Sequence, residues 1–177
     1  MTDICKMKMA GIFRARKDDI NDLVFLVNNA YRGQNAKKGW TTEANLLGGL
    51  RTNADSLTEI LNKPDSTILL FRNDKEIIGC VYLQQQDKQL YLGMLTVDPE
   101  KQGLGTGKQL LAASEKFALK KHCIEIVMTV ISVRFELIKW YERKGYFKTG
   151  ETKPFPTDTK FGIPKQPLEF IVLKKKL

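Results

Sequence analysis

Residues 92–108, LGMLTVDPEKQGLGTGK, hold the most informative pattern in the chain. An apolar run ends at Val97, a glycine-rich turn covers residues 103–107, and helical spacing is present from this turn onwards. We therefore predict a strand, a tight turn and the start of a helix. Glycines at alternate positions let the backbone approach a ligand closely, and the first N–H groups of a helix are unpaired at the positive end of its dipole. This arrangement predicts a phosphate site, to which Lys108 adds a positive charge.

Two familiar phosphate-binding motifs do not match this turn. A Walker A loop needs Gly five residues before its Gly-Lys pair and Ser or Thr after it, but these positions are Gln102 and Gln109. A dinucleotide-binding fingerprint needs a third Gly where Lys108 stands, and no clear parallel strand with a ribose-binding carboxylate follows. A glycine turn without any ligand remains as the structural alternative, although three alternate glycines are costly unless the backbone must face something.

Length and composition indicate one folded domain over residues 1–177. The chain is 42% hydrophobic and 28% charged, which supplies enough apolar material for a core and argues against disorder. Its apolar runs are much shorter than the roughly 20 residues of a membrane-spanning helix. Residues 1–10 lack the continuous apolar stretch of a secretory signal. We therefore expect a cytoplasmic protein with no membrane partner.

Cysteine and histidine are scarce. Three scattered cysteines are too few for a disulfide framework, and no C-x-x-C pair is present. The one histidine, His122, follows two lysines at a predicted helix end, where positive charge complements the helix dipole. Zinc sites draw several ligands from these two residue types, so we expect no metal and a structural role for His122.

The net charge of +9 favours a polyanion or an acidic ligand. Residues 174–176 are three lysines that would suit nucleic acid, but a short basic tail is more often only solvated. The aromatic and basic pattern of a known RNA-binding module does not accompany it. We therefore expect no nucleic-acid partner.

The apolar spacing alternates between the periods of strands and helices, which indicates an α/β or α+β fold. Helical spacing is present over residues 20–31, 57–61, 103–121 and 133–144. Thr42 is placed to cap a further helix that carries Leu46, Leu47 and Leu50. The segments predicted as strands are residues 12–16, 67–72, 76–83, 89–97, 124–131 and 168–173. Residues 152–166 are rich in proline, and we predict a long ordered loop or lid there.

The glycine turn resembles the signature of the GNAT superfamily of N-acetyltransferases, Q/R-x-x-G-x-G/A, which follows the fourth strand of that fold. Gln102, Gly105 and Gly107 match it without a gap. A later family motif, with an aromatic residue and Tyr before Gly and another aromatic residue, is similar to Trp140-Tyr141-Glu142-Arg143-Lys144-Gly145-Tyr146-Phe147. The resemblance implies a mostly antiparallel central sheet with helices on both faces, splayed at the fourth strand, where Gly93 is placed to mark a bulge.

The resemblance also implies acetyl-coenzyme A as the cofactor. In the family, backbone amides of the glycine turn hold the pyrophosphate, a role that here falls to Gln102, Gly103, Leu104, Gly105, Thr106, Gly107 and Lys108. The pantetheine arm pairs through backbone groups with the splayed end of the fourth strand, here Leu95, Thr96 and Val97. Arg143 is a candidate for binding a coenzyme phosphate, with solvation at the surface as its alternative.

The catalytic assignments follow from the same resemblance. The tyrosine of the later motif protonates the departing thiolate in the family, and the matching residue is Tyr141, for which packing in the core is the alternative. A phenol suits this step because its usual pKa of about 10 lies above the pKa of a thiol, about 8.5. A backbone N–H near Leu95 is the matching oxyanion donor. Residues 91–96 include no carboxylate, so we expect a water relay in place of a general base.

The acceptor wall is predicted from residues in the regions where relatives bind their acceptors. Tyr31 and Trp40 are its aromatic candidates, with packing in the core as the alternative. Glu43 is placed to receive a proton or hold an ammonium group, unless it stabilises the first turn of a helix. Arg134 would meet an acidic part of the acceptor or coenzyme, although relatives often carry Asn near this position.

We therefore expect an N-acetyltransferase that moves an acetyl group from the thioester directly to a primary amine of a small molecule or a peptide. A noncatalytic coenzyme-binding regulatory module is the alternative, favoured by the missing carboxylate and disfavoured by Tyr141. A basic nucleic-acid-binding protein is a third reading. The identity of the acceptor stays open, and so does the assembly, for which a homodimer is one option.

Overall fold

The structure is a computed structural model that describes residues 10–39 and 42–177. Its centre is a seven-stranded sheet in which only β5 and β6 pair in parallel. In spatial order the strands are β1 (Ala10–Arg14), β3 (Ser66–Asn73), β4 (Glu76–Gln86), β5 (Gln89–Val97), β6 (Glu125–Ile131), β9 (Glu169–Lys176) and β7 (Phe147–Pro154). The predicted mixed fold with a mostly antiparallel sheet is confirmed.

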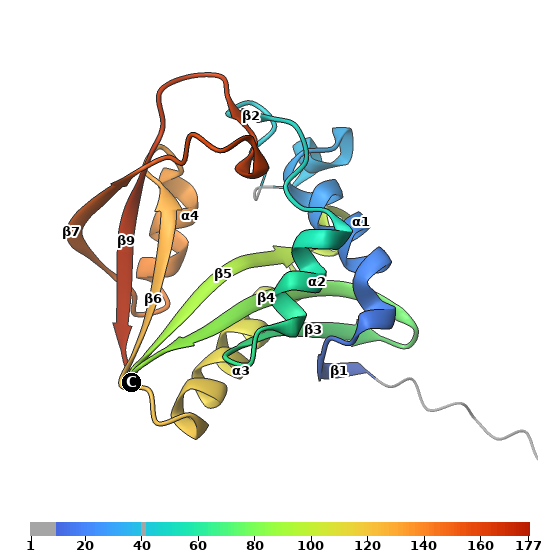
Figure 1. The fold of residues 1–177 in the computed structure, drawn as a ribbon, viewed down its shortest axis with the longest axis vertical. Helices are drawn as coiled ribbons and strands as arrows, with labels where there is room; N and C mark the ends of the chain where they lie inside the picture. The colour runs from blue at the N-terminus through green and yellow to red at the C-terminus, as the bar shows by residue number, and fades with distance from the viewer. Residues whose placement is uncertain (1–9, 40–41) are drawn as a thin grey trace, which may run out of the picture.

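Helices cover both faces of this sheet (Figure 1). One face packs against α1 (Ile20–Tyr31) and α2 (Ala54–Asn62), and the other against α3 (Thr106–Lys120) and α4 (Phe135–Glu142). The alternation of side chains along β3 explains both layers, because successive residues of a strand point to opposite faces. The α1 side receives Ile68 and Leu70, whereas Leu69 and Phe71 pack on the α3 side. Short 3-10 helices span Lys17–Asp19, Gln34–Lys38, Pro99–Lys101 and Thr159–Phe161.

The sheet is splayed between β5 and β6, as predicted. The two strands pair over only three positions, the last of which is Tyr91 opposite Val127, and then diverge (Figure 1). Beyond Tyr91, the edge of β5 that faces β6 therefore has backbone groups available for another extended chain. A bulge accompanies the splay, but it lies just after Gly93, which pairs regularly with Tyr82. The extra residue is accommodated at Met94, whose φ of 50° is in the left-handed region.

The predicted helix with Leu46, Leu47 and Leu50 is wrong. The Thr42 hydroxyl accepts a hydrogen bond from the nearby N–H of Ala44, at 3.2 Å, and the chain then forms strand β2 (Leu47–Gly48). This strand pairs with β8 (Ile163–Pro164) in a separate two-stranded sheet. Gly49 has a φ of +78°, which a right-handed helix does not accommodate. Glycine's low helix propensity therefore outweighs the leucine spacing here.

Strand β7 was not predicted, because neither of its faces is buried. Its residues, FKTGETKP, are almost all exposed, and it lies at the edge of the sheet beside β9. Lysine and proline are common on such edges, where they discourage pairing with another chain. The predicted ordered loop over residues 152–166 therefore begins inside β7 and contains β8.

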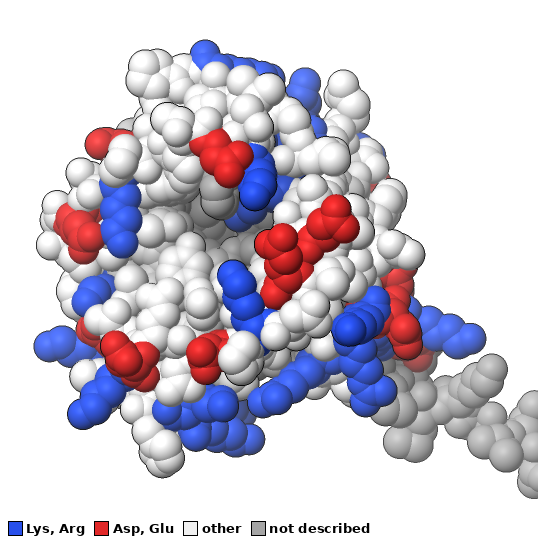
Figure 2. Space-filling view, viewed as in Figure 1, with Lys and Arg blue, Asp and Glu red and all other residues white. Residues whose placement is uncertain are grey.

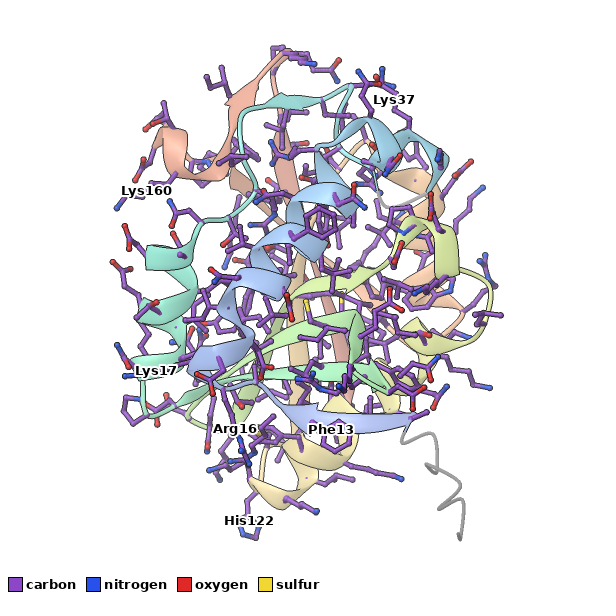
Figure 3. The ribbon with its side chains drawn as sticks, turned by 90° about the vertical axis from the view of Figure 1, so that its right-hand side faces the viewer. Phe13, Arg16, Lys17, Lys37, His122 and Lys160 are labelled. Carbon is purple, nitrogen blue, oxygen red and sulfur yellow. The ribbon has the colours of Figure 1, made fainter. Side chains whose placement is uncertain are left out.

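Two peripheral features bear on the sequence predictions. His122 follows α3, is exposed, and projects away from the body of the protein (Figure 3). In the described parts of the chain, no helix combines the length and apolar character needed to cross a membrane.

Candidate active site

Two adjoining cavities lie where the sheet is splayed. The first, called the turn cavity, has a volume of about 320 Å³ and follows the glycine turn and the start of α3. The second, called the splay cavity, has a volume of about 350 Å³ and lies between the diverging ends of β5 and β6. Four residues line both cavities: Tyr31, Leu95, Leu137 and Tyr141. Figure 2 shows the molecule from the same side as Figure 1, with a hollow near the middle of the view and both basic and acidic side chains around it.

The glycine turn has open backbone that fits a diphosphate. Gly103 and Gly105 have φ values of +86° and +81°, and a Cβ built at either position would meet nothing within 4 Å. Gly105 is the N-cap of α3, and the first turn of this helix carries no acidic residue and no side-chain cap. The unpaired N–H groups at the start of α3 therefore face the turn cavity, at the positive end of the helix dipole. Lys108 also lines this cavity.

Most of the predicted coenzyme-binding residues line the turn cavity. They are Leu95, Val97, Gln102, Gly103, Gly105, Thr106, Gly107 and Lys108. Three others do not. Leu104 points to solvent with 72% of its surface exposed, and the buried Thr96 hydroxyl donates to the Met94 carbonyl at 3.0 Å. Arg143 is exposed and lies in a separate shallow cavity beside Glu136.

Tyr141 lies on α4 at the junction of the two cavities. Its ring is buried and packs edge-on against Trp140 and Tyr146, with ring centres 5.1 and 5.6 Å away. Burial raises the pKa of the Tyr141 hydroxyl well above its usual value, the neighbouring Tyr31 raises it further, and Arg134 partly offsets this. The hydroxyl is therefore protonated at neutral pH.

Tyr31, at the end of α1, lies on the same boundary. Its hydroxyl donates a 2.7 Å hydrogen bond to the carbonyl oxygen of Leu95 in the bulged part of β5. The guanidinium of Arg51 lies over its ring, 5.5 Å from the centre. Burial raises the pKa of Tyr31 to about 12, an effect that Arg51 opposes. Tyr31 therefore belongs to the core packed around α1 and also lines both cavities.

Glu43 and Arg134 both line the splay cavity, and they are joined in one buried charge cluster. Oε2 of Glu43 lies 3.1 Å from Arg32, and Oε1 lies 3.8 Å from Arg134. The three side chains are only 5–12% exposed. The carboxylate is thus neutralised by two guanidinium groups, an arrangement that suits structural support better than proton transfer. The remaining acceptor candidate, Trp40, lies outside the described residues.

Several lining residues were not anticipated from the sequence. Trp140 and Lys144 line the turn cavity, with the Lys144 ammonium 5.8 Å from the indole ring centre. Their spacing along α4 and its end could have revealed them, since residues four apart share a helix face. Arg51 and Lys153 line the splay cavity from an irregular loop and an edge strand, and no local pattern marks them. The described residues contain no cluster of three or more His, Cys, Asp or Glu arranged to hold a metal ion.

Comparison with known proteins gives the class. Residues 43–156 match the family model described as "Acetyltransferase (GNAT) domain". This match covers more than half of the chain, which therefore belongs to the GNAT acetyltransferase family, as the two motifs indicated.

Individual relatives are more distant. Human N-acetyltransferase 8B is 27% identical over 124 residues. The match covers 66% of this chain and 54% of that protein, so the chain spans about half the length of this curated relative. The ribosomal-protein-S18-alanine N-acetyltransferase from Escherichia coli has a similar fold, with a TM-score of 0.70, 13% identity, and coverage of 95% and 94% of the two chains. A putative acetyltransferase from Salmonella typhimurium, solved with its cofactor acetyl-CoA, has a TM-score of 0.68, 17% identity and the same coverage.

Proposed function

We propose that residues 1–177 act as one domain that transfers the acetyl group of acetyl-coenzyme A directly to a primary amine. The observation that carries the proposal is the meeting of the two cavities at Tyr141, with the open glycine turn on one side. Membership of the GNAT family and the acetyl-CoA bound to the Salmonella typhimurium relative support the choice of donor. A cytoplasmic location and the absence of a nucleic-acid partner remain predictions from the sequence.

The turn cavity is the proposed site of the coenzyme. Backbone amides of residues 102–108 would hold the pyrophosphate, and Lys108 and Lys144 would add positive charge. The unpaired edge of β5 beyond Tyr91 would hold the pantetheine arm through backbone hydrogen bonds. The coenzyme supplies an acetyl thioester, whose carbonyl carbon accepts the amine nitrogen. The N–H of Leu95 is the proposed donor to the carbonyl oxygen.

Tyr141 is the proposed general acid. As sulfur takes the electron pair of the breaking carbon–sulfur bond, the phenol hydroxyl donates a hydrogen bond and then its proton to sulfur. The proton that the acceptor nitrogen loses restores the hydroxyl, so protons balance over the cycle. Because burial raises the pKa of Tyr141, the hydroxyl holds its proton until negative charge develops on sulfur, and a phenolate left after transfer is basic enough to take up a proton again.

The proton that restores Tyr141 leaves the acceptor nitrogen as the amide forms. An acceptor that arrives as an ammonium ion must first lose another proton before its nitrogen can attack. Glu43 is the one carboxylate among the described residues that line the splay cavity, and two guanidinium groups already neutralise it. We therefore keep the water relay as the route for this proton.

A free-thiol assay with acetyl-coenzyme A and a broad amine panel tests the proposal. Amine-dependent thiol release supports an enzyme, whereas coenzyme binding without turnover across the panel would favour the regulatory module. Salt-sensitive nucleic-acid binding without acetyl transfer would favour the third reading.

The role of Tyr141 has a matched control in Tyr146, which packs against it but lines neither cavity. Tyr141→Phe should lower kcat about 100-fold or more, in the range for loss of a general acid, while Tyr146→Phe should leave kcat near its original value. An unchanged rate for Tyr141→Phe, under conditions where chemistry limits turnover, would exclude the role.

A further inference from the structure

The splay cavity is rich in positive charge. Three cationic side chains line it, those of Arg51, Arg134 and Lys153. Among the described residues that line it, Glu43 is the one that carries a carboxylate. Glu43 is occupied by Arg32 and Arg134, so it does not neutralise the other two cations. Lys153 pairs with Glu151 at 3.6 Å, but both side chains are about half exposed, which makes this a weak surface pair. The cavity therefore favours an anionic group on its ligand.

Arg51 and the neighbouring Thr52 are held in position by contacts with α1. The backbone N–H of Arg51 donates to Oδ1 of Asn28 at 2.7 Å, and the side-chain amide of Asn28 donates to the carbonyl of Thr52 at 2.9 Å. The Arg51 guanidinium lies over the ring of Tyr31, which is itself fixed by its bond to Leu95. None of the carboxylates in the described segments forms an ion pair with Arg51. A preorganised guanidinium of this kind binds a carboxylate well, because it presents paired donors at little entropic cost.

The rest of the wall is largely apolar. Met128, Leu137 and Phe170 line it together with Pro154 and Pro156. Such a surface favours an aliphatic or aromatic substituent on the ligand.

Residues 155–168, between β7 and β9, are called the roof here because they border one side of the splay cavity. The roof reaches across the molecule to β2 (Figure 1), where the backbone N–H of Lys165 donates to the carbonyl of Leu46 at 2.9 Å. The Lys165 ammonium also donates to the carbonyl of Ala44, at 2.7 Å. This roof supplies Pro156 to the cavity wall, and the cavity volume of about 350 Å³ lies in the range of small-molecule sites, so the space favours a small molecule over a loop of a folded protein.

These charges also bear on the chemistry. Nearby cations disfavour a protonated amine, because like charges repel, and so favour the neutral nucleophile. A polyamine would be repelled by the same cations. An amine that carries its own carboxylate would be attracted to these cations. Near them, its ammonium group would lose a proton more readily than in water, which suits a site without a free carboxylate base.

We propose that the acceptor is a small amine that carries a carboxylate and an apolar substituent, as in an apolar amino acid, and that Arg51 binds the carboxylate. This inference rests on the proposed acetyl transfer for its substrate and makes Arg51 a specificity-determining residue.

Matched acceptors test the inference directly. We would compare kcat/KM for L-phenylalanine, L-phenylalaninamide and 2-phenylethylamine, and for L-leucine and L-methionine with their amides. At least one acid should exceed its amide about tenfold or more, in line with the loss of a charge-assisted hydrogen bond. Arg51→Gln should abolish this advantage by raising KM for the acid while leaving the amide almost unchanged, and Arg51→Lys should retain part of it.

Arg16 provides the matched control. It is an exposed arginine beside β1 (Figure 3) and lines neither cavity, so Arg16→Gln should keep the preference for the acid. Amides acetylated as well as the acids, or an Arg51→Gln variant that slows acids and amides equally, would overturn the inference while leaving acetyl transfer intact.

A binding measurement separates this inference from the proposed function. Calorimetric titration of the coenzyme-loaded protein with N-acetyl-L-phenylalanine, N-acetyl-L-leucine and their amides needs no turnover. If the protein binds the acids more tightly than the amides, and Arg51→Gln removes this difference, the carboxylate site is supported even if no amine is acetylated. In that case only the proposed function would fail. An absence of any acid preference in both binding and turnover would overturn the inference.

Discussion

The hydroxyl of Tyr31 donates a 2.7 Å hydrogen bond to the carbonyl oxygen of Leu95, across 64 positions of the chain. This bond joins the end of α1 to the bulged part of β5, at the boundary of the two cavities. It therefore fixes the backbone that the proposed reaction uses for the coenzyme and the oxyanion.

Tyr31→Phe should remove this bond and leave the ring in place. A neutral hydrogen bond contributes about 1 kcal/mol, so the free energy of unfolding in urea should fall by about that amount, and kcat/KM should fall several-fold as the bulge loosens. Tyr82→Phe is the control, because the Tyr82 hydroxyl bonds to Gln84 and Ser66 in a partly exposed place and the residue lines neither cavity. Equal effects of the two substitutions would contradict a special role for the Tyr31 bond.

The glycine turn predicts opposite stability effects for two substitutions. Gly105→Ala places a side chain at a φ of +81°, which should cost about 1–2 kcal/mol. Gly107→Ala lies inside α3, where its Cβ would meet Val97 and Trp140 at ordinary contact distances of 3.6 and 3.7 Å. Higher helix propensity should then stabilise the protein by up to about 1 kcal/mol. Thermal unfolding midpoints measure both, and a midpoint for Gly105→Ala at or above that of the unsubstituted protein would refute the strain argument.

Much of this site could be predicted because its main part is local in sequence. The order of strand, glycine turn and helix depends on residues 92–108 alone, and the structure has these elements in that order. The position of Tyr141 on a helix was predictable for the same reason, since the spacing within one helix determines which residues share a face.

The remainder depends on contacts between distant segments. Glu43 has its two guanidinium partners at positions 32 and 134, and no periodicity in the sequence links them. Strand β7 is exposed on both faces, so it lacks the alternation that reveals a half-buried strand. Arg51 comes directly after the segment predicted as a helix with Leu46, Leu47 and Leu50, and its place at the cavity depends on Asn28. The acceptor side was therefore harder to predict than the coenzyme side.

Glu43→Gln should test whether Glu43 supports the site or acts as a base. Removing one partner of a buried ion pair leaves the other charge uncompensated, so unfolding should become easier by about 3 kcal/mol. The Lys38–Glu100 pair has side chains about 60% exposed, and Glu100→Gln should cost less than about 1 kcal/mol. The folded Glu43→Gln variant should keep kcat within about tenfold, whereas loss of a general base costs about 100-fold or more. A loss of that size without loss of stability would reverse the assignment.

Cys80 predicts a loss of stability at alkaline pH. Burial raises the pKa of its thiol from 9.0 to about 12 in the folded state. Above pH 9 the unfolded thiol loses its proton while the folded one keeps it, so the unfolded state is favoured as pH rises towards 12. One such group lowers the free energy of unfolding by at most about 1.4 kcal/mol per pH unit in this window and has no effect well below pH 9.

Urea titrations at pH 8, 9 and 10 should show this decline, and Cys80→Ala should make it shallower between pH 9 and 10. Cys123→Ala is the comparison, because Lys121 opposes the effect of burial on the pKa of that thiol. An equally steep decline in Cys80→Ala would assign the alkaline effect to other groups.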